Sequence, residues 1–237
     1  MIVKNDLFDY QDRYIYQDDT LFKFSFDSIL LAEYASNFTN DKMEILDLCT
    51  GNMAVPLIMS KYTSSRIIGF EIQKEVYELG LKSLKENNLE ANLTIINDDV
   101  KKIKEYYKSE FFDIMVCNPP FFKVGSSLKN QKEGLSLARH EETITLEDIF
   151  NIAKGFLKNN GALIMVHRAN RLDDIINLGT RYHLNIKNIQ LVSTKKGKKP
   201  SIVLIRAVKN SKSGVIINSE LCIENLNTYQ RIFKEVL

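Results

Sequence analysis

The chain has 237 residues, of which 44% are hydrophobic and 26% charged, a balance that excludes a disordered or collagen-like chain. Its 32 Lys and Arg residues against 30 Asp and Glu residues leave a net charge of +2, so any binding to a polyanion must rely on local basic clusters. The cysteines Cys49, Cys117 and Cys222 are widely spaced, which argues against a disulfide framework or a zinc knuckle and suits a reducing cytoplasm. No apolar run reaches about 18 residues, so we expect no membrane span.

Short apolar runs bounded by turn residues predict buried strands. The predicted strands are residues 44–48, 66–70, 93–96, 112–116, 162–166, 186–192 and 202–207. Helices are predicted at residues 28–38, from residue 54 onward, at 74–88 and at 146–157. Thr145, with Asp148 three residues later, is typical of a helix start, and the Asn-Asn-Gly run at 159–161 is typical of a helix end.

The alternation of strands and helices predicts an α/β fold, with parallel strands joined by right-handed crossovers in a doubly wound sheet. Only residues 193–201 separate the last two strands, too few for a helical crossover, so these strands must form an antiparallel hairpin. We expect one domain: an N-terminal extension and first helix at 1–40, a core at 41–210, and a C-terminal strand and helix at 211–237. In such sheets ligands bind beyond the carboxyl ends of the strands.

Polar residues follow each of the first three predicted strands. Asp47 opens a tight turn with a single glycine, Gly51; it is neither a Walker loop nor a full dinucleotide fingerprint, and an ordinary strand-to-helix turn is an equal interpretation. Glu71 follows Asp47 at close to the interval of about 20 residues at which an acidic side chain binds ribose hydroxyls in dinucleotide-binding folds. The alternative is that Glu71 is a solvated acid. Asp98 or Asp99 either accepts a hydrogen bond from an adenine amine or caps the lysine-rich segment that follows.

The sharpest signal is Asn118-Pro119-Pro120-Phe121 after the fourth strand. Two prolines cannot continue a strand ladder. They predict a rigid kink that projects Asn118 and Phe121 at the carboxyl edge of the sheet, and the alternative is a loop that the prolines merely stiffen.

This motif resembles the Asn-Pro-Pro-aromatic signature of class I S-adenosylmethionine-dependent amino methyltransferases, whose substrates are an exocyclic amine of adenine or cytosine or a glutamine amide. That class has a Rossmann-like, mostly parallel seven-stranded sheet with a C-terminal antiparallel hairpin. Residues 24–32, 47–52, 138–141 and 195–200 further resemble the bacterial tRNA adenine-N6 methyltransferase family, which acts on the adenine next to the anticodon of a valine tRNA. The resemblance covers about residues 16–209 and implies S-adenosylmethionine as cofactor and tRNA as partner.

The resemblance also implies three groups of site residues. The catalytic group is Asn118, Pro119, Pro120 and Phe121. The cofactor group is Asp47, Cys49, Thr50, Gly51 and Asn52 at the methionine end, Glu71 at the ribose and Asp99 at the adenine, with Asp27 either near the methionine end or a plain helix cap. The RNA group includes Phe122, Arg139 and His140. The last two lie in the long segment 123–145, which we expect to close over the substrate.

The proposed chemistry follows from these residue types. An exocyclic adenine amine is a poor nucleophile because its lone pair is delocalised into the ring. Hydrogen bonds from the amine to the Asn118 side-chain oxygen and the Pro119 carbonyl would pull its nitrogen toward tetrahedral geometry and free the lone pair to attack the sulfonium methyl. Phe121, with Phe122, would stack on the splayed-out base.

Lys195, Lys196, Lys198 and Lys199 form a basic cluster between the last two strands, which either contacts RNA phosphates or is a solvated hairpin tip. The three histidines lack metal-ligand spacing, so no metal is expected. Met53 and Cys49 stand where the related families often carry glycine, and Phe121 where tyrosine is frequent. A positive φ at Met53 would weaken cofactor binding. Two other functions stay open: methylation of a protein glutamine amide, and non-catalytic RNA binding on a degenerate scaffold.

Overall fold

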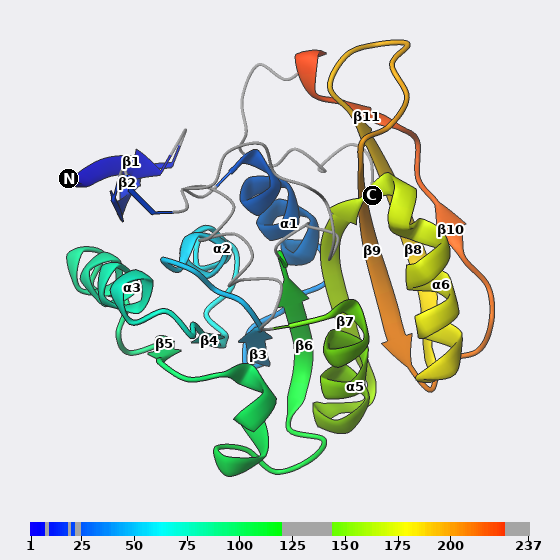
Figure 1. Ribbon diagram of the computed structural model, residues 1–237, viewed down its shortest axis with the longest axis horizontal. Coiled ribbons are helices and arrows are strands. Elements are labelled where there is room, and N and C mark those ends of the chain that lie inside the picture. Colours follow the sequence, from blue (N-terminus) through cyan, green and yellow to red (C-terminus); the bar gives the residue numbers. More distant parts are fainter. Residues whose placement is uncertain (8–9, 19, 22–24, 120–143, 226–237) are drawn as a thin grey trace.

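The computed structural model describes residues 1–7, 10–18, 20–21, 25–119 and 144–225, and shows a central sheet flanked by helices (Figure 1). The helices are α1 (Phe26–Ser36), α2 (Ala54–Met59), α3 (Lys74–Glu86), α5 (Leu146–Phe156) and α6 (Leu172–Arg181), with the 3-10 turns η1 (Val100–Glu105), η2 (Ala169–Arg171) and η3 (Ile223–Asn225). The strands are β1 (Ile2–Leu7), β2 (Tyr10–Asp18), β3 (Glu44–Asp47), β4 (Arg66–Phe70), β5 (Leu93–Ile96), β6 (Phe112–Cys117), β7 (Leu157–Arg168), β8 (Leu184–Ser193), β9 (Ile202–Lys209), β10 (Ile216–Ile217) and β11 (Leu221–Cys222).

The strand order of the main sheet is β10-β8-β9-β7-β6-β3-β4-β5, and β11 also pairs with β8. All seven predicted strands are present, and β9 runs antiparallel to both β7 and β8, so the predicted C-terminal hairpin is confirmed. The chain moves outward from β3 through β4 to β5 and then returns to β6 on the other side of β3. The carboxyl ends of β3 and β6 therefore mark the topological switch point, where doubly wound sheets bind their ligands.

Helices cover both faces of the sheet, which explains why its strands read as nearly continuous apolar runs. Successive strand residues point to opposite faces. Ile45 of β3 joins the cluster formed with α1, α2 and α3, whereas Leu46 joins the cluster formed with η1, α5 and α6. Each face thus has its own apolar core.

Thr145 and Asp27 are both candidate helix N-caps in the sequence, and of the two only Thr145 is one. Thr145 caps α5 through a capping box: its hydroxyl accepts from the Asp148 N–H at 3.1 Å, and the Asp148 carboxylate accepts from the Thr145 N–H at 2.9 Å. In α1 the N-cap position belongs to Ser25, and the helix begins at Phe26 rather than 28. Asp27 therefore does not cap α1 but lies within its first turn, where a negative charge interacts favourably with the helix dipole.

The N-terminal hairpin of β1 and β2 was not predicted. Its sequence shows little apolar alternation. The free edge of β2 bonds to side chains of α3 and its C-cap instead of to a third strand: the Tyr16 N–H donates to Ser83 Oγ and the Tyr14 N–H to Asn87 Oδ1, both at 2.9 Å. At the other end of the chain, residues 211–225 contain β10, β11 and η3. Residues 226–237 lie outside the described residues, so the predicted C-terminal helix stays a prediction. Among the described helices, none is long and apolar enough to cross a membrane.

Candidate active site

The sheet brings three of the predicted site residues, Asp47, Glu71 and Asn118, to one edge. Asp47 ends β3 and pairs in register with Gly69 of β4 on one side and Val116 of β6 on the other. Glu71 and Asn118, each just beyond its strand, therefore lie at the same carboxyl edge as Asp47.

The β3–α2 turn is held by Glu71. Its carboxylate accepts from the Gly51 N–H at 3.0 Å and from the Gln73 N–H at 2.8 Å. Glu71 is only 7% exposed, and its burial raises its pKa. The alternative that Glu71 is a solvated acid is therefore wrong. A carboxylate has about four acceptor positions, so ligand hydroxyls can bind alongside these backbone donors.

Asp47 is a buried carboxylate in need of a donor. It is 1% exposed, and neither carboxylate oxygen has a hydrogen-bond partner among the described residues. Burial raises the pKa of Asp47 to about 7; the nearby Thr50 hydroxyl and the Cys49 N–H oppose this effect only in part, and the charge of Glu71 reinforces it. Because a buried acceptor without a donor is costly, the site is suited to a cationic or N–H-bearing ligand.

The middle of the turn adopts two left-handed conformations, with φ of 60° at Gly51 and 72° at Met53. The positive φ considered at Met53 is thus present; its effect on cofactor affinity stays a prediction. The Met53 side chain is fully buried and accepts from the Thr50 hydroxyl at Sδ, 3.2 Å away. Gly69 was missed: a Cβ there would lie 2.6 Å from the Thr50 side chain, so glycine is required for Thr50 to pack against β4.

Asn52 and Cys49 play other parts in the same turn. The Asn52 amide donates to the Tyr16 carbonyl at 2.9 Å and so fastens β2 over the turn. Cys49 is half-buried beside Cys117, which is fully buried at the end of β6. Burial, together with the hydrogen bond that the Cys117 thiol donates to the neighbouring Cys49 sulfur, raises the pKa of the Cys117 thiol.

After β5, the two aspartates have different partners. Asp99 caps η1 by accepting from the Lys101 N–H at 2.9 Å, so the interpretation as a cap is confirmed. Asp98 accepts from the Lys102 ammonium and the Tyr106 hydroxyl, each at 2.8 Å, and these bonds lower its pKa to about 2. Sequence reasoning missed the neighbouring Ile72, a 42% exposed apolar side chain directly after Glu71.

Asn118 lies half-buried at the end of β6, and its Nδ2 donates to the Ser28 hydroxyl of α1 at 3.1 Å. Asp27, next to Ser28, has its pKa raised by burial, an effect that the charge of Arg168 opposes. Pro119 is buried. The predicted residues Pro120, Phe121, Phe122, Arg139 and His140 lie outside the described residues, as does most of the segment 123–145.

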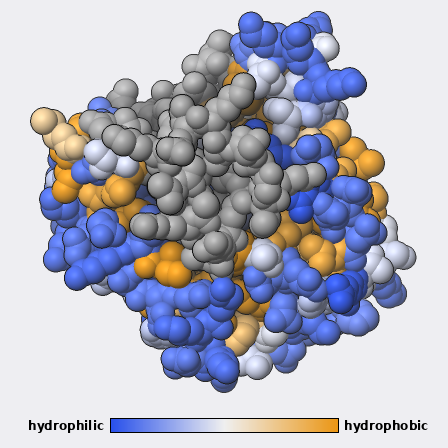
Figure 2. All heavy atoms as spheres, viewed as in Figure 1, coloured by the Kyte–Doolittle hydropathy of each residue, from blue (hydrophilic) through white to orange (hydrophobic). Residues whose placement is uncertain are grey.

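The lysine cluster lies at the tip of the β8–β9 hairpin. Because β8 runs parallel to β7, this tip is at the carboxyl edge of the sheet, as Figure 1 shows. Lys195, Lys196, Lys198 and Lys199 are all exposed, and Figure 2 shows the tip as a protruding hydrophilic group at the upper right. At its base, the Ala169 N–H donates to the Ser201 carbonyl at 3.0 Å, which ties the hairpin to the end of β7.

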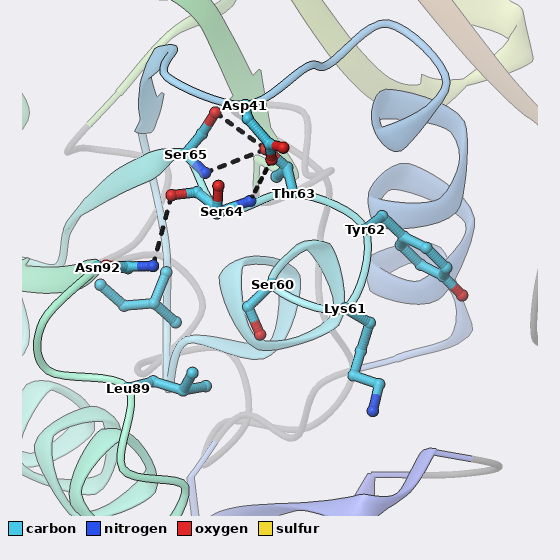
Figure 3. Close-up of a pocket in the computed structure, with 10 residues that line it drawn as sticks. Asp41, Ser60, Lys61, Tyr62, Thr63, Ser64, Ser65, Leu89 and Asn92 are labelled. Atoms are coloured by element: carbon cyan, nitrogen blue, oxygen red, sulfur yellow. Dashed lines mark hydrogen bonds between the residues drawn. The ribbon is translucent and has the colours of Figure 1, made fainter.

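A cavity of about 310 Å³ lies at the opposite edge, near the starts of β3, β4 and β5 (Figure 3). Its polar groups are already paired: the Asp41 carboxylate accepts from the Ser64 N–H at 2.7 Å, and the Ser65 hydroxyl donates to the Asn40 carbonyl at 2.6 Å. None of the predicted site residues lines it.

Proteins of similar sequence and solved structures of similar fold were compared with this chain. A protein called tRNA1(Val) (adenine(37)-N6)-methyltransferase from Phocaeicola vulgatus is 25% identical over 93% of this chain and 90% of its own length, and one of the same name from Bacteroides thetaiotaomicron is 25% identical over 98% and 95%. Among solved structures, a predicted O-methyltransferase from Agrobacterium tumefaciens has a TM-score of 0.66 at 18% identity, covering 88% of this chain and 94% of its own. TYW2 from M. jannaschii in complex with AdoMet has a TM-score of 0.59 at 12% identity, covering 87% and 85%.

The structural likenesses show a shared fold. The family profile described as a methyltransferase domain matches residues 39–202, which run from just before β3 to the start of β9 and include the switch point with Asp47, Glu71 and Asn118. A sheet of this order, a buried acidic edge at its switch point and a family match over more than half of the chain lead to one assignment: this chain belongs to the methyltransferase domain family.

Proposed function

We propose that this methyltransferase uses S-adenosylmethionine to methylate the exocyclic N6 amine of an adenine in tRNA, next to the anticodon of a valine tRNA. The observation that carries the proposal is the position of Asn118 and Pro119 directly after β6, beside the buried Asp47 at the switch point. The names of the curated relatives support the substrate. Such a substrate also supports a cytoplasmic location.

The described residues fit the proposed cofactor. Asp47, whose buried oxygens have no donor among the described residues, would accept from the ammonium of the methionine end, beside the turn 47–52. Glu71 would accept from the ribose hydroxyls, and Asp99, with the exposed Ile72, would border the adenine. When bound, the cofactor supplies an electrophilic methyl group on a sulfonium.

The chain's own residues would activate the amine. Because Asn118 Nδ2 already donates to Ser28, its Oδ1 is left to accept from the substrate amine, and the Pro119 carbonyl supplies a second acceptor. Both acceptors are neutral, so neither needs a shifted pKa. The product proton leaves after methyl transfer, and the remaining acceleration comes from holding the two reactants in line.

The RNA would approach the same edge. The hairpin tip with Lys195, Lys196, Lys198 and Lys199 would contact backbone phosphates. We propose that Phe121 and Phe122 stack on the extruded adenine and that Arg139 and His140 contact RNA; this part of the proposal rests on the sequence. The exposed lysines favour an RNA substrate over a protein glutamine.

Nucleoside mass spectrometry tests the proposal. Total tRNA from cells with and without the gene is digested, and N6-methyladenosine is quantified; we expect it to disappear from the valine tRNA without the gene and to return with the wild-type gene but not with Asn118→Ala. In vitro, the purified protein should methylate a valine tRNA transcript but not one with guanine in place of the target adenine. Unchanged N6-methyladenosine in the deletion strain would refute the substrate. Loss of a modified glutamine in a protein instead would favour the glutamine alternative.

A further inference from the structure

One contact of the candidate active site was not predicted from the sequence. Ser28 lies in the first turn of α1 and is 4% exposed. Its Oγ is 3.1 Å from Nδ2 of Asn118, a residue 90 positions further along the chain. Helix α1 packs against β6 and β7, and this packing brings the start of the helix to the end of β6 (Figure 1).

The contact has a chemical consequence. The side-chain amide of asparagine carries its acceptor oxygen and its donor nitrogen on opposite sides. A rotation that exchanged the two would present N–H groups to the substrate amine, which is itself a donor, and would remove one of the two acceptors that the proposed reaction needs. A partner that accepts from Nδ2 therefore determines which side the oxygen faces.

We propose that Ser28 is a positioning residue: by accepting from Nδ2 of Asn118, it holds the Asn118 oxygen toward the amine to be methylated. The inference rests on the proposed function. The cap position of α1 belongs to Ser25, and the Ser28 backbone N–H donates to the Ser25 carbonyl at 3.0 Å. The Ser28 hydroxyl is thus not needed as a cap for α1 and is available to accept from Asn118.

Three variants test the hydroxyl. Ser28→Ala removes it, and Ser28→Cys fills almost the same space with a much weaker acceptor. Ser36→Ala is the matched control, because Ser36 is also a buried serine of α1, and its hydroxyl donates to the Ala32 carbonyl at 2.7 Å, within the helix. We expect single-turnover methyl transfer, at saturating tRNA and S-adenosylmethionine, to be slowed about 10-fold in both Ser28 variants, as for the loss of one neutral hydrogen bond. Ser36→Ala should keep the wild-type rate.

Comparing the rate of methyl transfer with the dissociation constants separates a positioning role of Ser28 from a general loss of structure. The dissociation constants for S-adenosylmethionine and for tRNA should be unchanged in Ser28→Ala. In the Asn118→Ala background, Ser28→Ala should slow the reaction no further, because the group it positions is gone. Ser28→Cys at the wild-type rate would attribute the serine to packing and overturn the inference, as would wild-type activity of Ser28→Ala or an additive loss in the double variant. A wild-type protein that methylates no tRNA would overturn the proposed function itself, and the inference with it.

Discussion

At the residue scale, the proposed function assigns neutral acceptors of the candidate active site to the substrate and its buried acids to the cofactor. Asn118, the proposed substrate acceptor, follows β6, whereas Asp47 at the end of β3 and Glu71 just beyond β4 are 1% and 7% exposed. The two sets should therefore respond differently to substitution. The neutral acceptor affects the rate, and the acids affect binding and stability.

Asn118→Ala should leave S-adenosylmethionine binding unchanged and slow methyl transfer by roughly 10²–10³-fold, by analogy with the loss of one oxyanion-hole donor. Calorimetry of cofactor binding and radiolabelled methyl transfer to tRNA measure the two effects. A variant that methylates at the normal rate would show that the chemistry does not use Asn118.

Glu71→Ala should lower both cofactor affinity and stability. It leaves the Gly51 and Gln73 N–H donors without their acceptor and removes the proposed ribose ligand, with each effect costing about 1–3 kcal/mol. Calorimetry and urea unfolding separate the two. Glu71→Gln, which keeps one acceptor oxygen, should lose less stability. Unchanged cofactor affinity in Glu71→Ala would remove Glu71 from the ribose site.

The stability of the ligand-free protein should depend on pH through Asp47. The pKa of this carboxyl is about 7 in the folded protein and about 3.9 in the unfolded chain, so between these values the folded state binds the extra proton. Stability is therefore lost as pH rises from about 4 to about 7, by up to about 1.4 kcal/mol per pH unit. Asp47→Asn should flatten this slope in unfolding curves measured across that range. Equal slopes in both proteins would mean that Asp47 is ionised throughout.

At the element scale, the β8–β9 hairpin presents its lysine-rich tip at the carboxyl edge of the sheet, because β8 and β7 run in the same direction. If all four lysines of the tip contact phosphates, their replacement by alanine should lower the log–log salt slope of tRNA binding by about 3 to 4 units. Affinity should fall equally for all tRNAs, because phosphate contacts carry no sequence information.

The matched control for the hairpin variant removes the same number of positive charges from the amino edge of the sheet, opposite the hairpin tip. Lys85, Lys108, Lys154 and Lys212 are exposed and belong to segments that lead into the amino ends of strands. Their replacement by alanine should leave the salt slope nearly unchanged. Filter binding at several salt concentrations compares the two quadruple variants, and an unchanged slope in the hairpin variant would identify its lysines as a solvated tip.

At the scale of the whole molecule, the N-terminal hairpin is fastened to the core through a buried acid. Glu33 of α1 is 1% exposed and accepts from the hydroxyls of Tyr10 in β2 and Tyr62 beyond α2. Tyr10→Phe should destabilise the protein by about 1–3 kcal/mol, because it removes a donor from a buried acceptor. Tyr16→Phe is the control, since its hydroxyl bonds to Glu86 at the surface and should cost under about 0.5 kcal/mol. Urea unfolding measures both, and equal losses would contradict this view of the hairpin.

Sequence reasoning found what depends on local pattern. The seven strands β3 to β9, the capping box at Thr145 and the turn after Asp47 each follow from side chains within a few residues of one another. The N-terminal hairpin was not predicted, because its two strands pair with each other, outside the main sheet, and show little of the apolar alternation that indicates a buried strand.

The sequence by itself determined the strands β3 to β9, most of the helices between them and the chemistry available at the strand ends, but neither the N-terminal hairpin nor α6. Tertiary structure decided the partners: that Glu71 is buried and holds the Gly51 N–H, that Asp47 is left without a donor among the described residues, and that Ser28 meets Asn118. The physical reason is distance along the chain. Hydrophobic periodicity is a local property, whereas a hydrogen bond between residues 90 positions apart exists only after the packing of a helix on a sheet has brought them together.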